Sequence, residues 1–454
     1  MDKPATMLEV YLEPFDRPVG LLRQAGKTPG EIEFTYDPDY LQRADKIQLS
    51  LRLPLREQPY DDVVARPYFE NLLPEGRRRD QEAARAGTTA NDVIGILGLI
   101  GKDCAGAVSL VRPGERPVKR PALLPDDYDP LDEETLIQSL RRLEQGMPAD
   151  QKEKPSLAGV QGKIAVAMDR NGAFYMPCNG AATTHLIKVS DRQFPNGVDN
   201  EYFCLSLLKR LGIPTVNFQK RRFMAADGTQ LDALIVDRYD RKIVSQGNGL
   251  EVSRLHQEDF CQALGCTSYA KYEHRGGPTL QRIFEVAEHT AVPASTRQTL
   301  LEALIANLLC GNSDAHAKNF SLVYQQGSKY PSLAPIYDIL CVKLYPDYNH
   351  DMAQKIGGTA NPDEIAKADL EAFAKETTIG WKLLAKTVNK LVSKATPIAI
   401  TLSREIDVSR FHASRILGVI DARSRHLADI MGISYPDYGI DAFVERSPGW
   451  QMLS

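Results

Sequence analysis

The sequence lacks the features that would place the protein in a membrane, outside the cell or directly on nucleic acid. Its most apolar short stretches, such as 93–100, are far below the roughly 18–20 residues that cross a bilayer. The first residues carry acids and no long apolar run, so we expect no secretory signal. The 454 residues have a formal net charge of −4, which leaves no basic excess for a phosphate backbone.

Cysteine and histidine are too scattered to indicate a structural metal site. The seven cysteines occur singly, without a CxxC pair, so we expect neither a disulfide framework nor a zinc site. The eight histidines form no HExxH motif. Together these absences favour a reducing compartment, and we predict a cytoplasmic protein.

The order of the patterns along the chain predicts several units rather than one core, because the chain is too long for one. We expect a small α+β unit at 1–111 and a proline-rich linker with a short helix at 112–150. A mixed α/β unit should follow at 151–258, and a helical unit at 259–454. Strand-like patterns within these units occur at 7–17, 47–53, 164–168, 185–189 and 234–236, and helical patterns at 199–211, 300–309, 383–391 and 416–427.

The segment 311–320 carries the residue types that phosphoryl transfer needs. Asp314 and Asn319 are five positions apart, and Asp338 follows a later turn or strand. The chemistry requires a carboxylate that deprotonates the attacking hydroxyl and hard oxygen ligands for Mg²⁺, and protein kinases use this spacing. Asp314 is the candidate base, and Asn319 and Asp338 are the candidate metal ligands. The alternative is that these residues are helix caps or turn formers.

A lysine on a strand and a glycine-containing loop are candidates for phosphate contacts. Lys188 ends a strand-like run and can point into a cleft, where Glu201 at the start of the next helix can pair with it. Glycines in the segment Ser-Leu-Ala-Gly-Val-Gln-Gly-Lys (156–163) would let backbone N–H groups approach phosphates closely. The alternatives are a solvated edge-strand lysine and an ordinary hairpin turn.

The segment Asp237-Arg-Tyr-Asp240 follows an apolar strand, as a hinge between two lobes would. Its backbone groups can bond an adenine edge, and Asp240 can bond a ribose hydroxyl. An ordinary charged loop remains the alternative.

Taken together in this order, the motifs resemble the HipA kinases of bacterial toxin–antitoxin systems. Two N-terminal motifs resemble the family's N-terminal subdomain: Phe-Glu-Asn-Leu-Leu-Pro (69–74) and Gly-Ala-Val-Ser-Leu (106–110). The others are Ser-x-x-Gly-x-Gln-x-Lys (156–163), Thr-His-Leu-Ile-Lys (184–188), Asp-Asn-Glu-Tyr (199–202), Asp-Arg-Tyr-Asp-Arg (237–241), Lys-Tyr-Glu-x-x-Gly-Gly-Pro (271–278), Asp-Ala-His-Ala-Lys-Asn-Phe (314–320) and Tyr-Asp-Ile (337–339).

The resemblance implies a bilobal, protein-kinase-like α+β fold: a mixed α/β N-lobe with an extra N-terminal subdomain, and an all-helical C-lobe. It implies an ATP-dependent serine/threonine-protein kinase that uses ATP and Mg²⁺, with Asp314 as catalytic base and Asn319 and Asp338 on the metal. Ser156 would be autophosphorylated, which inactivates the enzyme. The implied ATP-binding residues are Gly159, Gln161, Lys163, Lys188, Asp237, Tyr239, Asp240 and His316.

The resemblance also implies partners. A helix-turn-helix antitoxin of the HipB type would bind operator DNA and bring the toxin with it, and the family precedent for a protein substrate is an aminoacyl-tRNA synthetase. The chain departs from the best-known member at Asp237 and Tyr239, where that protein has Glu and Phe, and at Gly162, which replaces an acid. Two alternatives stay open: a catalytically silent co-repressor subunit and a small-molecule phosphotransferase.

Overall fold

The N-terminal unit is a four-stranded antiparallel sheet backed by helices. The computed structural model describes residues 6–13, 15–26, 30–147, 162–192, 194–247, 249–325 and 327–440. The sheet has the order β3-β2-β1-β4, and α2 and α4 pack against it. Its elements are β1 (Met7–Leu12), β2 (Gly20–Gln24), β3 (Ile32–Tyr36), β4 (Val108–Val111), α1 (Pro38–Gln42), α2 (Asp62–Glu70), α3 (Gly76–Arg85) and α4 (Val93–Ile100).

One expected strand in this unit is wrong. The segment 47–53 alternates apolar and polar residues, but it forms turns with only an isolated bridge between Ser50 and Leu53. Leu49 and Leu53 are nevertheless fully buried. The alternation therefore reported that the apolar side chains are buried, which does not require a hydrogen-bonded neighbouring strand.

A six-stranded antiparallel sheet forms the middle of the molecule, in the order β10-β11-β9-β7-β8-β6. The alternation predicted at 164–168, 185–189 and 234–236 is confirmed, since these residues lie in β7, β9 and β11. Two helices accompany the sheet, α5 (Glu133–Glu144) and α6 (Gly197–Leu211). The strands are β6 (Tyr128–Leu131), β7 (Lys163–Met168), β8 (Phe174–Pro177), β9 (His185–Val189), β10 (Phe218–Met224) and β11 (Gln230–Asp237).

Alternation along β9 decides which side chains face which helix. Ile187 and Val189 lie in the core that the α5 side chains Leu136 and Leu140 complete. Because successive side chains of a strand point to opposite faces, Lys188 points to the other face, where α6 lies.

The proline-rich segment is more than a linker. It contributes β5 (Ala122–Leu124) to a three-stranded sheet with β12 (Arg241–Gln246) and β13 (Gly249–Arg254), in the order β12-β13-β5. It also contributes β6, which contains Pro130 and forms the edge of the six-stranded sheet. Both are edge strands, where a proline that cannot donate a ladder hydrogen bond is tolerated. The helix expected after Asp132 is confirmed as α5, with Asp132 accepting a hydrogen bond from Thr135 N.

The resemblance implied an all-helical C-terminal portion. That expectation is wrong in part, because this portion is mostly helical but also contains strands. Strands β15 (Ser321–Tyr324) and β16 (Ser332–Leu333) pair with β14 (His256–Asp259). The buried apolar run of β15 needs partners for its backbone groups, and β14 and β16 supply them. The helices are α7 (Phe260–Leu264), α8 (Leu280–Glu285), α9 (Pro293–Cys310), α10 (Lys367–Glu376), α11 (Trp381–Glu405) and α12 (Arg410–Met431), and the short 3₁₀ turns are η1 (Gly101–Asp103), η2 (Ser268–Lys271), η3 (Glu273–Arg275), η4 (Val286–His289), η5 (Ala317–Asn319) and η6 (Val342–Leu344).

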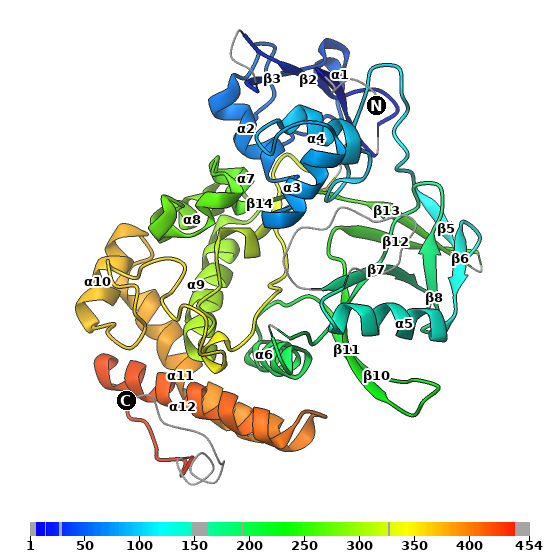
Figure 1. The fold of residues 1–454 in the computed structure, drawn as a ribbon. Helices are drawn as coiled ribbons and strands as arrows, with labels where there is room; N and C mark the ends of the chain where they lie inside the picture. The colour runs from blue at the N-terminus through cyan, green and yellow to red at the C-terminus, as the bar shows by residue number, and fades with distance from the viewer. Residues whose placement is uncertain are drawn as a thin grey trace.

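Helix α9 lies between these units in this view and packs against α11 and α12 (Figure 1). The N-terminal unit lies at the top of this view, the six-stranded sheet at the right and the long helices α11 and α12 at the lower left. Helix α6 packs against α11 and α12 as well as the sheet, so it joins the two larger parts. The seven cysteines are free thiols, and no helix of the described ranges is long and apolar enough to cross a membrane.

Candidate active site

An ion-pair cluster connects β9, α6 and the segment after β16. The Lys188 ammonium donates to both oxygens of Glu201, at 2.8 and 3.0 Å, and to Oδ1 of Asp338 at 2.8 Å. The Lys188 and Glu201 side chains are only 8% and 2% exposed, whereas that of Asp338 is 38% exposed. The Lys188 ammonium is therefore bound on its buried side by Glu201, and its other partner, Asp338, lies on the side that faces solvent.

The charges in this cluster stabilise one another unequally. The nearby Lys188 ammonium lowers the pKa of Asp338 to about 2, against the opposing effect of burial. Burial alone would lower the pKa of Lys188, but Asp338 and Glu201 raise it above its ordinary value. Burial and the neighbouring Asp338 raise the pKa of Glu201. At neutral pH the cluster thus presents a permanently charged ammonium and an ionised, partly exposed Asp338.

Asp338 adopts a left-handed backbone conformation, with φ of +57°. Residues other than glycine seldom adopt it, and asparagine and aspartate tolerate it best. The preceding residues are fixed because Ile336 exchanges backbone hydrogen bonds with Pro214 and Val216, at 2.9 and 3.0 Å. Such a conformation at a charged, half-open position is typical of functional loops.

Asp314 and Asn319 share a loop between α9 and β15. Helix α9 ends at Gly311 in the left-handed region, where a Cβ would come within 2.9 Å of Val419. The Asn319 amide nitrogen donates to the Asp314 carbonyl oxygen at 2.8 Å, which leaves its amide oxygen pointing the other way. The five-residue spacing thus corresponds to a closed loop in which the two residues meet.

The Asp314 carboxylate has an environment unlike that of Asp338. Its Oδ1 accepts a hydrogen bond from the Tyr272 hydroxyl. Burial raises the pKa of Asp314, the Tyr272 hydrogen bond opposes that rise, and the negative charge of Asp338 adds to it. The negative charge of Asp338 therefore acts on the Asp314 carboxyl.

His316 and Lys163 lie beside these groups. His316 is 6% exposed, its Nε2 is 4.0 Å from Asp314 Oδ1, and its Nδ1 has no hydrogen-bond partner among the described residues. Burial, with the positive charge of Lys271, lowers the pKa of His316 to about 3, so the ring is neutral. Lys163 faces Lys188 across the β7–β9 pair, and burial together with Lys188 lowers its pKa to about 8.

The three hinge residues have different environments. Asp237 has a half-exposed carboxylate that contacts Asn217 and His185, at 3.0 and 3.2 Å. Tyr239 stacks on Tyr337, with ring centroids 5.3 Å apart.

The Asp240 carboxylate is 5% exposed and already engaged by Arg238 and Arg241, at 2.9 Å each. This arrangement leaves Asp237 as the more accessible carboxylate of the hinge. Ser156, Gly159 and Gln161 lie outside the described residues.

Side chains without a role in the sequence analysis support the loop of Asp314 and Asn319. The ammonium of Lys318, next to Asn319, bonds Asn71 Oδ1 at 2.8 Å and pairs with Asp259 at 3.1 Å and Glu75 at 3.7 Å. Asn71 and Glu75 belong to the N-terminal unit. The available signals were the motif at 69–74, which contains Asn71 and is followed by Glu75, and the motif at 314–320, which contains Lys318.

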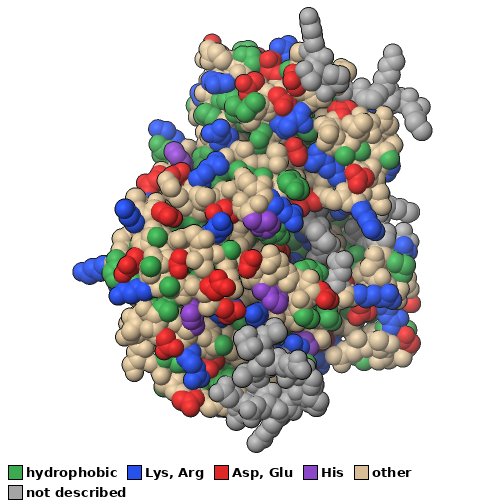
Figure 2. Space-filling view, turned by 60° about the vertical axis from the view of Figure 1, so that its left-hand side comes forward, with side chains coloured by type: hydrophobic (Ala, Val, Ile, Leu, Met, Phe, Trp, Pro, Cys, Tyr) green, Lys and Arg blue, Asp and Glu red, His purple; other side chains and the backbone are tan. Residues whose placement is uncertain are grey.

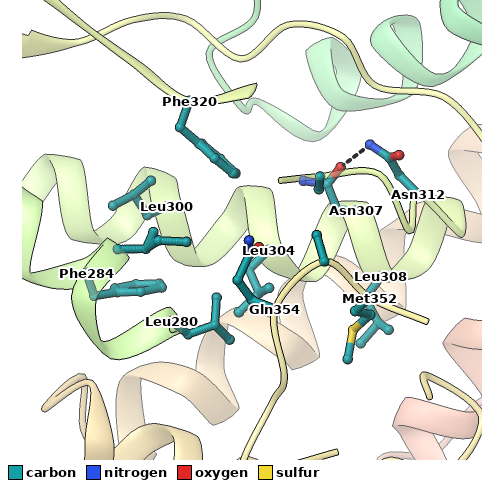
Figure 3. A pocket seen from close by; sticks show the side chains of 13 residues that line it. Leu280, Phe284, Leu300, Leu304, Asn307, Leu308, Asn312, Phe320, Met352 and Gln354 are labelled. Carbon is teal, nitrogen blue, oxygen red and sulfur yellow. Dashed lines mark hydrogen bonds between the residues drawn. The ribbon is translucent and has the colours of Figure 1, made fainter. Parts of the chain in front are cut away.

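An apolar pocket lies behind the loop of Asp314 and Asn319 and is too small for a nucleotide. Leu304, Leu308, Phe320 and Met352 line it together with Gln354 (Figure 3). Its volume of about 30 Å³ suits a single water molecule, and the Gln354 side-chain nitrogen has no partner among the described atoms.

Comparisons with known proteins agree with this architecture. Residues 8–111 match the HipA N-terminal domain, and residues 155–398 match the HipA-like C-terminal domain. The Y4mE protein of Sinorhizobium fredii is 34% identical over 88% of this chain and 91% of its own length. The serine/threonine-protein kinase toxin HipA of Shewanella oneidensis is 29% identical over 73% of this chain and 76% of its own length.

A solved structure of Shewanella oneidensis HipA, in complex with HipB and its operator DNA, superimposes with a TM-score of 0.76. It is 25% identical and covers 94% of this chain and 100% of that one. The likeness confirms the predicted α+β, kinase-like fold in its coarse form. Two family domains in the expected order and a full-length structural match lead to one conclusion: the chain belongs to the HipA family.

Proposed function

We propose that this protein is an ATP-dependent serine/threonine-protein kinase that acts as the toxin of a toxin–antitoxin system. The observation that carries the proposal is the Lys188 ammonium, held by Glu201 and Asp338 in the site that also contains Asp314. A cation for phosphates, a metal-ligand carboxylate and a base are the parts that phosphoryl transfer requires.

The nucleotide half of the site would be built by β9, the hinge and the Asp338 segment. Lys188 would bind the ATP phosphates while Glu201 keeps it charged and in place. Hinge backbone groups near Asp237 and Tyr239 would hold the adenine, and the accessible Asp237 carboxylate suits a ribose hydroxyl better than Asp240, which two arginines engage. The unpaired Nδ1 of neutral His316 offers a further polar contact.

The donor set also fits Mg²⁺. Asp338 supplies an ionised carboxylate, and Asn319 supplies an amide oxygen, because its amide nitrogen donates to the Asp314 carbonyl oxygen. Hard oxygen ligands of this kind suit Mg²⁺, which keeps several of its water ligands. When bound, the ion would neutralise charge on the phosphates. Lys163 would add positive charge beside Lys188, and Gly159 and Gln161 would belong to the loop over the phosphates.

Asp314 would accept the proton of a serine or threonine hydroxyl. The hydroxyl oxygen would form a bond to the γ-phosphorus. The bond between that phosphorus and the β–γ bridging oxygen would break, so that ADP leaves, and the hydroxyl proton would move to the Asp314 carboxylate. Because a base must be ionised beforehand, the raised pKa of this carboxyl sets a lower pH limit for the reaction.

The partners follow from the relatives. A HipB-like antitoxin would bind this chain and connect it to operator DNA, as in the complex of the Shewanella protein. Acidic and basic side chains are interspersed over the face in Figure 2, and the net charge is −4, so DNA contact would depend mainly on the antitoxin. An aminoacyl-tRNA synthetase would be the protein substrate, and autophosphorylation of Ser156 would inactivate the kinase.

Transfer of label from γ-labelled Mg–ATP tests the proposal. The wild-type chain should label itself and proteins of a heat-treated bacterial extract, with mass spectrometry placing the self-label on Ser156. Asp314→Asn should lower transfer by about 10²- to 10⁴-fold, the usual contribution of a general base. Asp429→Asn makes the same change at an exposed position on α12 and should have no effect.

Two results would contradict the proposal. If the wild-type chain transferred no label although it bound the antitoxin, the silent co-repressor alternative would hold. If Asp314→Asn transferred label at the wild-type rate, Asp314 would not be the base.

A further inference from the structure

Tyr272 makes a direct contact with the candidate base that the reaction described above does not use. Its hydroxyl donates a hydrogen bond to Asp314 Oδ1, across 42 positions of sequence. Tyr272 belongs to the motif Lys-Tyr-Glu-x-x-Gly-Gly-Pro (271–278), none of whose residues takes part in the proposed reaction. Among the described residues, the one ion-pair contact of the Asp314 carboxylate is His316 at 4.0 Å, and that ring is neutral at physiological pH.

The motif folds into a loop that holds Tyr272 in place. The backbone N–H groups of Arg275 and Gly277 both donate to the Tyr272 carbonyl oxygen, at 3.0 Å. A Cβ at Gly277 would come within 2.2 Å of Ala270 O and 2.6 Å of Tyr272 O. Glycine is therefore required at this position because the loop closes tightly on itself.

Neighbouring segments fix the same loop from outside. Glu273 N donates to Ala353 O at 2.9 Å, and the Lys271 ammonium pairs with Glu75 at 2.9 Å. The segment of Ala353 also borders the apolar pocket (Figure 3), so the loop rests on a packed part of the helical unit. Glu75 ties it to the N-terminal unit.

The Tyr272 ring is partly buried and packs against neighbouring side chains. The His316 ring meets it edge-on at 5.2 Å, and the Arg275 guanidinium lies 5.1 Å from its centroid. Edge-to-face and cation–π contacts of this kind favour one ring orientation. The direction of the hydroxyl is therefore set before any substrate arrives.

We propose that Tyr272 is a positioning residue that fixes the orientation of the Asp314 carboxylate for the acceptor hydroxyl. The Asp314 side chain remains 50% exposed with the bond to Tyr272 in place, so an acceptor can approach without displacing the tyrosine. The role rests on the proposed kinase function. Orientation of a reacting group is worth large factors in rate, since a misplacement of about 1 Å can cost about 10²-fold.

The test compares Tyr272→Phe with Tyr269→Phe, using the label-transfer assay with Mg–ATP and the heat-treated extract. Phenylalanine keeps the ring contacts and removes only the hydroxyl. We expect the maximal rate of Tyr272→Phe to fall about 10- to 100-fold, with the KM for ATP unchanged within about twofold, since Lys188 and Asp338 are untouched. Tyr269 lies just before this loop with 71% exposure, so Tyr269→Phe should behave as wild type.

A second variant moves the loop without removing the hydroxyl. Gly277→Ala introduces the Cβ that would collide with Ala270 O and Tyr272 O, and it should lower the maximal rate while leaving the KM for ATP unchanged. Thermal melting checks that both variants are folded.

The outcomes separate the two proposals. A wild-type chain that transfers no label refutes the kinase function itself. A wild-type chain that transfers label, with Tyr272→Phe at the same maximal rate, refutes the positioning role alone. A Tyr272→Phe variant that changes only the KM for ATP also refutes it, because the tyrosine would then act on the nucleotide half.

Discussion

The two halves of the site hold their carboxylates in opposite ways. Asp338 lies beside an ammonium, which lowers the pKa of its carboxyl to about 2. Asp314 contacts a neutral phenol and lies beside a neutral imidazole, and burial raises its pKa. A carboxylate metal ligand must be ionised at the pH where the enzyme works, whereas a base must also be able to take up a proton. The surroundings of each residue suit the role that we propose for it.

The halves also differ in what anchors them. Lys188 and Glu201 belong to β9 and α6, so the nucleotide half is fixed within the middle unit. The loop of Asp314 is fixed to Asn71 of the N-terminal unit through Lys318, and the Tyr272 loop that contacts it is fixed to Glu75 of the same unit through Lys271. This difference indicates that the N-terminal unit supports the acceptor half, and the following changes test it from the largest expected effect to the smallest.

Asp338→Asn should have the largest effect. It removes the ionised ligand, and the loss of several kcal/mol of metal-based charge stabilisation corresponds to about 10³-fold in transfer. Asparagine tolerates the left-handed backbone at φ of +57°, so the melting temperature should stay within a few degrees. Single-turnover transfer at saturating Mg–ATP measures the effect, and a loss below tenfold would count against the metal-ligand role.

Glu201→Gln should have a moderate effect confined to the nucleotide half. Lys188 keeps Asp338 as a partner, but losing the Glu201 charge draws the ammonium toward Asp338 and away from phosphates. We expect kcat/KM for ATP to fall about 10- to 100-fold, or about 1.4 to 2.8 kcal/mol. Glu134→Gln on the exposed side of α5 is the matched control. An unchanged kcat/KM would show that Glu201 does not hold the lysine for ATP.

The pH dependence of transfer should follow Asp314 and not Asp338. A carboxyl whose pKa is raised loses its ionised form as pH falls through that raised value, so the rate should decline at a pH above the ordinary aspartate range near 4. Asp338, with a pKa of about 2, stays ionised through this window. Initial rates of the wild-type chain between about pH 4 and 8 measure this acidic decline in rate. A rate that is flat down to pH 4 would contradict the assignment.

Glu75→Gln should have the smallest effect and should touch only the acceptor half. The glutamate is mostly buried, with its side chain 18% exposed, and it pairs with Lys271 and Lys318, each of which keeps other contacts. We expect about a two- to fivefold loss of maximal rate, or about 0.4 to 1 kcal/mol, because glutamine keeps the shape of the side chain and one oxygen that can accept from a lysine. The KM for ATP should not change. If Glu75→Gln changed the KM for ATP and not the maximal rate, the N-terminal unit would support the nucleotide half and not the acceptor half.

Local patterns were enough to predict most elements that carry the site. The alternation at 185–189 predicted β9, and helical spacing at 199–211 predicted α6, with Gly212 ending it in the left-handed region. The predicted pairing of Lys188 with Glu201 is confirmed. It could be predicted because short-range periodicity places the two residues on β9 and α6. The strand expected at 47–53 was wrong because alternation reports which side is buried and not whether a neighbour exists.

By itself the sequence determined which side chains share a face of a strand or helix, and therefore which chemical groups can point into one cleft. Only the tertiary structure decided which groups meet there. Lys188 and Asp338 are 150 positions apart, Tyr272 and Asp314 42, and Asn71 and Lys318 247. Side-chain periodicity is set within a few residues by backbone geometry, whereas contacts over such separations depend on how whole elements pack together.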